Sequence, residues 1–565
     1  MTRHDNKVFH SRPPRKVTTR LLLLGAWVAA TMLLPPAMAQ RDDSKDDGPV
    51  VHTAEGPVRG FVKNGVSTFL GIPYAAAPVG ALRWMPPQLV EHWAEPLDAT
   101  HYANTCPQVT ELGAFAGPSS ITEDCLYLNV FMSNLGHSGQ GKPVLVWIHG
   151  GGDVDGESND YDGTKLATGG PSGSPTVVVT MNYRLGLFGF LAHPALDREG
   201  HPFGNYGILD TQAVLQWVQR NIQAFGGDPT RVALGGQSAG AENTGANLLS
   251  PLAKDMFNRA ILQSGTIFNL FLPLSVALTD GTNFAAAAGC PGQDAATAAC
   301  LRSLSAARIL QLQGTPNASA AYVANVMVDG IIVPTAPDAA FSSGQFNRMP
   351  IMAGNTQHEL TFLNAITEYF SGPPQTAMTA AQYMTSITAA YPPATAAAVL
   401  AEYPVSDYPS PQLASSAAST DPLFGCQTRH FMNVLARWVP VYQYEFNYQN
   451  APYYFPDMPG FVPLASHTID IQFLFPNYHG GQLGVNSRPL NPEETTLSDQ
   501  LVAAWTNFAR TGNPNGSGNS PWPQFTSQPD APAVLSENLP DLSTFTEAQY
   551  AASHHCAFWD PILGY

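Results

Sequence analysis

The sequence has few charged residues and no excess of positive charge. Only 12% of its 565 residues are charged, and 26 basic residues stand against 43 acidic ones, so the formal net charge is −17. Because nucleic-acid binding needs clustered positive charge, this balance argues against nucleic acid as a partner. The hydrophobic fraction of 44% is instead typical of a large globular protein with a full core, and it excludes global disorder.

Long apolar runs are missing except near the start of the chain. There, a basic region precedes the apolar stretch Leu21–Leu34, and Ala37–Ala39 offers small residues at a cleavage site. This stretch is shorter than the ~20 residues that span a bilayer. We therefore predict a cleaved signal peptide over residues 1–39, a single domain over residues 40–565, no stable membrane anchor, and a secreted or periplasmic protein.

Cysteine is scarce, and the cysteines that are present do not form a metal-binding pattern. None belongs to a CxxC pair and no His lies at ligand spacing from one, so a structural zinc site is not expected. An even number of cysteines in an exported protein favours disulfides, although spacing alone does not select the pairs. The six cysteines are Cys106, Cys125, Cys290, Cys300, Cys426 and Cys556.

Short apolar runs and one helical pattern indicate the fold class. Pro143–Ile148, Thr176–Met181 and Arg231–Leu234 are rich in Val and are followed by turn residues, which predicts buried strands. Between the last two, residues 209–222 carry apolar side chains at helical spacing. This strand, helix, strand order predicts an α/β protein with a mostly parallel central sheet flanked by helices.

The second half of the chain contains both helical and loop-like segments. Residues 285–313 and 377–402 are rich in Ala, which predicts helices. Residues 364–375 and 407–422 are expected to form loops or a lid that shapes specificity, because Pro, Ser and Gly are frequent in parts of them. No segment has the length and composition of a hinge between domains.

A pentapeptide with two glycines predicts a nucleophile. Gly236–Gly240 reads Gly-Gln-Ser-Ala-Gly, and it follows a predicted strand and precedes a segment that can begin a helix. A nucleophile elbow needs small residues on both sides of the serine, because the sharp turn brings neighbouring backbone very close. The pattern alone is weak in a Gly-rich chain, but its strand and helix context favours Ser238 as a catalytic serine.

A glycine triplet predicts the groups that stabilise the reaction intermediate. His149–Gly152 follows the predicted strand that ends at Ile148. Consecutive glycines let backbone N–H groups approach an oxyanion without side-chain obstruction. We expect Gly151, Gly152 and Ala239 to donate these N–H groups; the alternative is a flexible Gly turn without a catalytic role.

Further motifs, spread over nearly the whole chain after its first 40 residues, resemble a known family. They are Phe69–Tyr74, Leu82–Trp84, Glu123–Asn129, Asn182–Arg184, Phe225–Pro229 and Phe508–Pro514. Together with the serine motif they resemble the type-B carboxylesterases, the α/β-hydrolase family that includes the cholinesterases, in the form of a bacterial-type secreted member. The resemblance implies an α/β-hydrolase fold with large lid or cap insertions.

The resemblance also implies the partners of the serine. The family's acid corresponds to Glu359 in Ala353–Glu359, and the family's base corresponds to His467 in Ala465–Asp470. The order Ser, Glu, His along the chain is the one expected for α/β-hydrolases.

The resemblance extends to structural pairs. It implies the disulfides Cys106–Cys125, Cys290–Cys300 and Cys426–Cys556, and the buried ion pairs Arg83–Glu123 and Arg184–Asp210.

The predicted activity is hydrolysis of a carboxylic ester of a small molecule, through an acyl-enzyme on Ser238 and without a metal or organic cofactor. Two alternatives remain: a lipase- or polyester-type hydrolase with the same triad, and a non-catalytic binding protein of the same fold. The loop between Cys106 and Cys125 contains no Trp, so an ester of a quaternary ammonium alcohol is not expected. The oligomeric state is left open.

Four positions depart from the family pattern. Asp153 follows the glycine triplet where an aromatic residue is usual, which predicts a more acidic or polar pocket mouth; the alternative is a solvated turn. Gln237 precedes the serine in place of the usual Glu, and this exchange is expected to reduce negative charge near the nucleophile. Glu242 and Asn243 stand where small apolar residues are common, and the sequence gives no physical reason for them.

Overall fold

The structure is a computed structural model, and it describes most of the chain after the first 47 residues. The described residues are 48–109, 117–134, 141–266, 268–314, 325–476, 478, 488–516, 519–540 and 542–565. The predicted signal peptide over residues 1–39 lies outside them. Residues Gly48–Tyr565 form one unit by their internal contacts.

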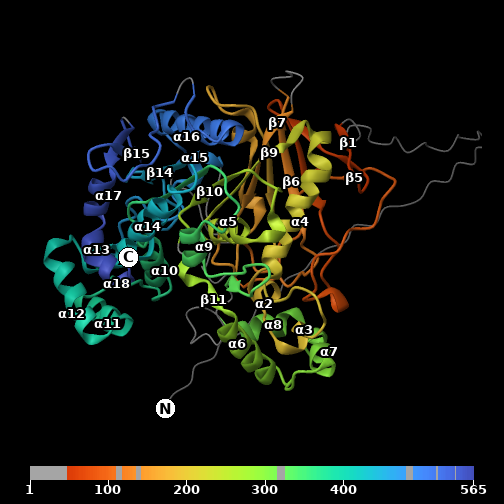
Figure 1. The fold of residues 1–565 in the computed structure, drawn as a ribbon, viewed down its shortest axis with the longest axis horizontal. Coiled ribbons are helices and arrows are strands. Elements are labelled where there is room, and N and C mark those ends of the chain that lie inside the picture. Colours follow the sequence, from red (N-terminus) through yellow and green to blue (C-terminus); the bar gives the residue numbers. More distant parts are fainter. Residues whose placement is uncertain are drawn as a thin grey trace, which may run out of the picture. The chain divides into compact units, whose positions relative to one another are not determined.

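A large mixed sheet forms the centre of this unit (Figure 1). Among the described residues its eleven strands lie in the order β16, β15, β14, β13, β10, β9, β7, β8, β6, β4, β3. The strands from β15 to β8 are parallel to their neighbours, whereas β16 at one edge and β6, β4 and β3 at the other run antiparallel. The strands are β3 (Phe61–Lys63), β4 (Val66–Pro73), β6 (Tyr127–Ser133), β7 (Lys142–Ile148), β8 (Val177–Met181), β9 (Gly227–Gln237), β10 (Arg259–Gln263), β13 (Ile351–Thr356), β14 (Val441–Phe446), β15 (Pro532–Glu537) and β16 (Ser543–Thr546).

Five short strands lie outside the central sheet. In the described residues β1, β2 and β5 form a small three-stranded sheet, and β11 pairs with β12. These strands are β1 (Val50–His52), β2 (Pro57–Arg59), β5 (Leu97–Asp98), β11 (Leu272–Pro273) and β12 (Met327–Val328).

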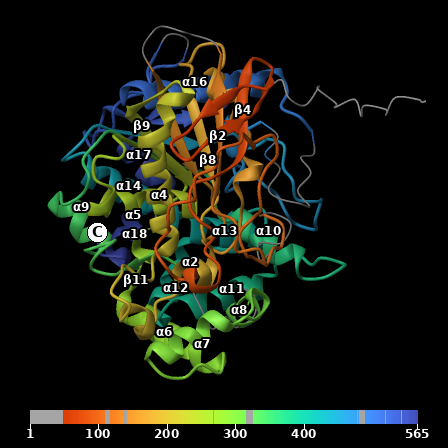
Figure 2. The same cartoon turned by 90° about the vertical axis from the view of Figure 1, so that its right-hand side faces the viewer.

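Helices surround the sheet and also form insertions between its strands. In both views α16 lies at one end of the unit and α6 and α7 at the other (Figures 1 and 2). The helices are α1 (Thr164–Thr168), α2 (Gly186–Phe190), α3 (Pro194–Asp197), α4 (Tyr206–Asn221), α5 (Ala239–Leu249), α6 (Leu274–Ala287), α7 (Ala295–Ser303), α8 (Ala306–Gln313), α9 (Pro337–Ser343), α10 (Thr361–Tyr369), α11 (Ala380–Ala390), α12 (Pro393–Glu402), α13 (Pro411–Thr420), α14 (Cys426–Leu435), α15 (Ile471–Leu474), α16 (Pro492–Thr511), α17 (Glu547–Ser553) and α18 (Cys556–Leu563). The segments α6–α9 and α10–α14 are inserted between β10 and β13 and between β13 and β14, respectively.

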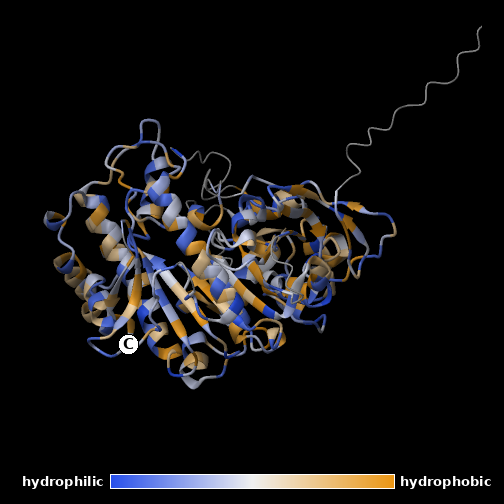
Figure 3. Cartoon of the chain, turned by 90° about the horizontal axis from the view of Figure 1, so that it is seen from above, coloured by the Kyte–Doolittle hydropathy of each residue, from blue (hydrophilic) through white to orange (hydrophobic). Residues whose placement is uncertain are grey.

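The alternation of side chains along the strands explains why the sheet is buried on both faces. In β7, Val144, Val146 and Ile148 belong to one hydrophobic cluster, whereas Leu145 and Trp147 belong to the cluster on the opposite face. A parallel strand covered by helices on both faces is apolar throughout, which is the pattern that predicted it from the sequence. Figure 3 shows that the surrounding helices mix hydrophobic and hydrophilic residues along their length.

The expected strands and helices are present, but both segments expected to be loops contain helix. The predicted strands correspond to β7, β8 and the second half of β9, and the predicted helix over residues 209–222 corresponds to α4. Residues 407–422, however, contain helix α13, in which Ser410 caps the N-terminus and Pro411 occupies the first turn. Residues 364–375 likewise begin inside α10. In residues 407–422, Ser410 and Pro411 therefore mark the start of a helix rather than a loop.

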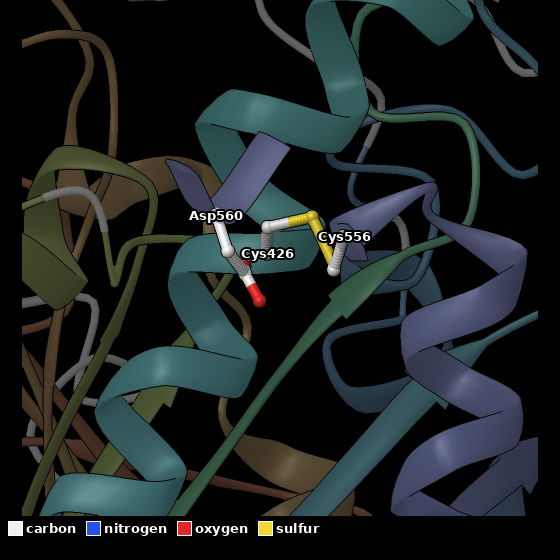
Figure 4. Close-up of side chains that lie close together, drawn as sticks. All are labelled: Cys426, Cys556 and Asp560. Atoms are coloured by element: carbon white, nitrogen blue, oxygen red, sulfur yellow. A yellow bond between two sulfur atoms is a disulfide. The ribbon is translucent and has the colours of Figure 1, made fainter. Parts of the chain in front are cut away.

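All six cysteines form disulfides, in the pairs that the family resemblance implies. The bonds are Cys106–Cys125, Cys290–Cys300 and Cys426–Cys556. Figure 4 shows the last of these bonds beside the carboxylate of Asp560. Because both sulfurs are bonded to each other, this group offers no thiolate to a metal ion.

Two buried ion pairs support the loops around the sheet. Arg83 contacts Glu123 over 2.5 Å, and Arg184 contacts Asp210 over 2.8 Å, as the resemblance implies. Within the residues that the structure describes, no helix has the length and hydropathy needed to cross a bilayer.

Candidate active site

The predicted site residues meet where parallel strands of the central sheet end. Ser238 directly follows β9, and the glycine triplet after His149 directly follows the neighbouring β7. Glu359 lies three residues beyond the end of β13. In open α/β sheets the carboxyl ends of the strands form the crevice that binds ligands. Ser238 and His467 both line a cavity of about 280 Å³ at this edge.

Ser238 occupies a strained turn between a strand and a helix. Its φ of 56° and ψ of −128° are rare for a residue with a side chain, and α5 begins at the next residue. A Cβ at Gly240 would lie 2.1 Å from the carbonyl oxygen of Ile148, and a Cβ at Gly236 would lie 2.4 Å from the backbone of Gly240. Only glycine fits at both positions, so the two glycines of the motif are required by the turn itself.

Unpaired backbone donors lie next to this serine. Gly151 and Gly152 have φ values of 110° and 60°, which turn the chain into the cavity. Among the described residues, no acceptor bonds to the N–H of either glycine. Ala239 is the first residue of α5, so its N–H has no acceptor within the helix. The positive end of the α5 dipole therefore also points toward the serine.

His467 and Glu359 are in direct contact. Nδ1 of His467 is hydrogen-bonded to Oε2 of Glu359, while Oε1 of Glu359 accepts the backbone N–H of Thr356 over 2.7 Å. The backbone N–H of His467 also donates to the carbonyl oxygen of Glu359 over 3.2 Å. Glu359 is fully buried and His467 is only 7% exposed. These contacts fix the orientation of the imidazole and leave its Nε2 facing the cavity.

The second nitrogen of His467 contacts Gln237 rather than Ser238. Nε2 of His467 lies 3.1 Å from Nε2 of the Gln237 side chain, so the amide donates to the imidazole if that nitrogen is unprotonated. In the described residues no hydrogen bond joins Ser238 and His467. The rings of Phe362 and Phe424 pack against the imidazole with centroid distances of 5.6 Å. The structure thus brings His467 into the cavity of Ser238, with Gln237 as its neighbour.

The cavity has a largely apolar wall and several carboxyl groups. The apolar lining residues are Leu270, Leu360, Phe362, Leu363, Leu423 and Phe424. The acidic lining residues are Asp153, Glu157, Asp160 and Glu242. Within the described part of the chain, no Lys or Arg lines it. Such a site suits a neutral or positively charged substrate with an apolar portion.

Residues 47–559 match the carboxylesterase family. The chain belongs to the carboxylesterase family. The match covers all strands and helices that build the cavity, so the mixed sheet described above is an α/β-hydrolase fold and the enzyme is a carboxylesterase. Family members carry out ester hydrolysis, and this activity identifies an ester as the substrate.

Curated relatives of this carboxylesterase include enzymes that act on different esters. It is 33% identical to an acylcarnitine hydrolase of Mus musculus over 517 residues, which covers 87% of this chain and 88% of the relative. It is 33% identical to a cocaine esterase of Homo sapiens, covering 88% of this chain and 89% of the relative. A fumonisin B1 esterase of Sphingopyxis macrogoltabida is 34% identical, with 87% and 86% covered.

The sequence did not reveal how Asp153 is used in this carboxylesterase. Its side chain is only 2% exposed and lines the cavity, so the alternative of a solvated turn is wrong. Oδ1 of Asp153 accepts hydrogen bonds from the Tyr183 hydroxyl over 3.1 Å and from the Asn243 amide over 2.9 Å. Burial raises the pKa of Asp153 to about 7, against the lowering effect of these two bonds. This contact explains the presence of Asn243, because its side chain holds Asp153 in place.

Two further acidic groups lie near the site: Asp470, to which the sequence analysis gave no role, and Glu242, for which it found no physical reason. Asp470 is buried behind the triad residues, and burial together with the charge of Glu359 raises its pKa to about 7. Glu242 lies in the first turn of α5, and burial together with the charge of Asp153 raises its pKa well above the usual value. The position of Glu242 just after the serine motif was the only signal in the sequence that could have placed it at the cavity.

Proposed function

We propose that this carboxylesterase cleaves its substrate through a covalent ester on Ser238. His467 takes the proton of the Ser238 hydroxyl on Nε2 as the oxygen attacks the ester carbonyl. Glu359 holds the imidazole by Nδ1 and stabilises the positive charge that forms on it. The contact between His467 and Glu359 in the cavity of Ser238 is the observation that supports this assignment most strongly.

The backbone donors supply the oxyanion hole in this proposal. The N–H groups of Gly151, Gly152 and Ala239 bind the carbonyl oxygen as it becomes negative. Collapse of the tetrahedral intermediate breaks the bond to the alcohol, and the imidazolium returns its proton to the leaving oxygen. Water then attacks the acyl-enzyme in the same manner, and the carboxylic acid and the free serine are restored.

The proposal assigns a changing partner to the imidazole. In the free enzyme the Gln237 amide contacts Nε2 of His467. When an ester occupies the cavity, the Ser238 hydroxyl replaces this amide as the donor to Nε2. Hydrogen bonds of catalytic groups commonly tighten only in the substrate complex, so the contact seen here is compatible with the reaction.

Hydrolysis of p-nitrophenyl esters tests the proposed nucleophile. The wild type and Ser238→Ala are compared on a series from acetate to palmitate, and the Ala variant is expected to lose at least about 10³-fold in kcat. Circular dichroism establishes that the variant is folded. Full activity of a folded Ser238→Ala enzyme would contradict the assignment.

The same series separates a carboxylesterase for short acyl chains from a lipase- or polyester-type enzyme. A cavity of about 280 Å³ holds a small ester, so we expect the optimum at short chains. An optimum at palmitate would instead favour the lipase-type alternative.

We also infer that the enzyme acts outside the cytoplasm. All six cysteines are disulfide-bonded, and such bonds persist in oxidising compartments. The predicted cleavage after Ala39 then leaves a protein that begins at Gln40. Mass spectrometry of the protein recovered from the periplasm or medium tests this; a protein that retains residues 1–39 would contradict it.

A further inference from the structure

Two carboxyl groups on different elements face the same end of the catalytic cavity. Asp153 comes from the loop after β7, and Glu242 comes from the first turn of α5. Both side chains line the cavity, and they are 2% and 6% exposed, respectively. They lie close enough for the charge of Asp153 to act on Glu242. The chain thus concentrates two acidic groups where solvent is largely excluded.

Within the part of the chain that the structure describes, the carboxyl group of Glu242 has no partner. Among the described residues, no hydrogen bond or ion pair reaches either of its oxygens, although the residue is more than nine-tenths buried. A buried carboxyl group without a partner costs free energy, so such a group is retained where a ligand completes it. Among its described lining residues, the cavity has no Lys or Arg that could pair with its four acidic residues.

Asp153 is held in place in a way that leaves one oxygen available. The Tyr183 hydroxyl and the Asn243 amide both donate to Oδ1. No described residue bonds to Oδ2. Asn243 and Glu242 are adjacent on α5, so the same turn of helix fixes Asp153 and presents the second carboxyl group. The pair is therefore a built feature of the site rather than two unrelated surface acids.

We propose that Asp153 and Glu242 form a subsite that binds a protonated amine of the ester substrate: the ammonium charge lies between the two carboxylates, and an N–H group donates to them. Burial raises the pKa of both carboxyl groups in the free site, and the charge of a bound ammonium ion favours their ionised forms. Its N–H group also supplies a donor for Glu242. The apolar wall formed by residues such as Leu270 and Leu423 contacts the carbon skeleton of the same substrate. This subsite rests on the proposed function in one respect: the ester must react in this cavity.

Matched esters test the subsite at neutral pH. Dimethylaminopropyl benzoate carries a protonated amine, and isohexyl benzoate is its all-carbon isostere. The wild type is expected to prefer the amine ester in kcat/KM by about tenfold, the size of one charge-assisted hydrogen bond. A second pair, ethyl dimethylaminobutanoate and its all-carbon analogue, places the amine on the acyl side. Preference in either pair supports the proposal, and absence of preference in both overturns it.

Neutral variants locate the effect. In Glu242→Gln the preference is expected to fall to about twofold or less, and circular dichroism establishes that the variant is folded. Asp160→Asn removes a carboxyl group from the same cavity and serves as the matched control. An equal loss of preference in Asp160→Asn would show a general effect of cavity charge and would overturn the subsite.

A positively charged ester without an N–H group tests whether the subsite needs a hydrogen-bond donor. Trimethylammoniopropyl benzoate has the charge of the amine ester but no N–H group. We expect it to lose most of the preference, because the carboxylates then accept no hydrogen bond. An equal preference for the quaternary ester would contradict the proposed hydrogen bonds.

Binding without turnover separates this proposal from the proposed nucleophile. Calorimetry measures the affinity of Ser238→Ala for the butyldimethylammonium ion, and the double variant with Glu242→Gln is expected to bind it about tenfold more weakly. Equal affinities would overturn the subsite even if Ser238 is the nucleophile. If Ser238→Ala remains an active esterase, the nucleophile assignment fails while the binding result stands by itself.

Discussion

Two buried histidines of this carboxylesterase contact carboxylates, but they differ in what surrounds the ring. Nδ1 of His467 contacts Glu359, and its Nε2 faces the cavity. Both nitrogens of His554 contact carboxylates: Nδ1 lies 2.8 Å from Asp421 and Nε2 lies 2.5 Å from Glu445. Both nitrogens of His554 face an acidic group, whereas the second nitrogen of His467 contacts only the neutral amide of Gln237. We therefore expect the same residue type to serve stability at His554 and, as proposed above, catalysis at His467.

The pKa of His554 reflects its contacts with two carboxylates. Burial alone would lower it, but the charge of Glu445 and the hydrogen bonds to Glu445 and Asp421 outweigh burial and raise the pKa to about 10. His554 is therefore charged at neutral pH and links α17 to β14 and to η9 (Asp421–Gly425). Phe424 of η9 packs against the ring of His467, so η9 contacts both histidines.

The largest expected effect comes from removing the catalytic ring. His467→Gln is expected to lower kcat by about 10³-fold or more, because no other group then accepts the serine proton. The melting temperature should fall less than for a variant at His554, because Glu359 keeps the backbone N–H of Thr356 as a donor. Activity assays and thermal melts of the same preparation check both halves. A variant that loses stability and retains activity would reverse the roles assigned to the two histidines.

His554→Gln is expected to produce the opposite pattern. It leaves the carboxylates of Asp421 and Glu445 without their cation, and breaking a buried pair costs about 3–5 kcal/mol. The free energy of unfolding in urea should fall by this amount, while folded enzyme keeps kcat within about tenfold of wild type. The neighbouring His555→Asn is the control, because His555 is partly exposed and pairs with Glu402 at the surface. Equal effects of the two variants would contradict a special role for His554.

The pH dependence of stability sharpens the comparison. Because the pKa of His554 is raised on folding, its contribution is full below its unfolded pKa of about 6.5 and is lost as pH rises through about 10. Wild-type stability should therefore fall more steeply between these values than that of His554→Gln. Urea titrations across this range measure the slopes. Parallel curves for the two proteins would show that His554 does not carry this contribution.

The smallest effect is expected from the neighbour of the catalytic ring. Gln237→Glu places a negative charge beside Nε2 of His467, and an adjacent carboxylate favours the protonated imidazole. The acidic limb of the kcat/KM profile should move to higher pH by about one unit. Gln237→Met, of similar size and without charge, should leave the limb in place. A limb that is unmoved by the Glu would indicate that residue 237 does not face the base during the reaction.

The sharp turn between a strand and a helix at Ser238 was predictable from the sequence, because the glycines it requires and the flanking strand and helix are close together along the chain. The core strands were predictable for the same reason, since burial on both faces leaves a continuous apolar run. Glu359 and His467 are 108 positions apart, and only the family resemblance brought them together.

Other features depend on contacts that sequence spacing does not reveal. Asp153 and Glu242 lie on separate elements, so their shared end of the cavity emerges only in the fold. Helix α13 was mistaken for a loop because its helical character comes from burying Ala414 and Ala418 against neighbouring helices, which overrides its polar composition.

Covalent capture tests the central claim most directly. A p-nitrophenyl phosphonate that mimics the tetrahedral intermediate is added to wild type, and the modified residue is located by peptide mass spectrometry. We predict one phosphonyl group on Ser238, release of an equal amount of nitrophenol, and strongly slowed labelling in His467→Gln. Labelling of another residue, or labelling at the wild-type rate in His467→Gln, would contradict the account.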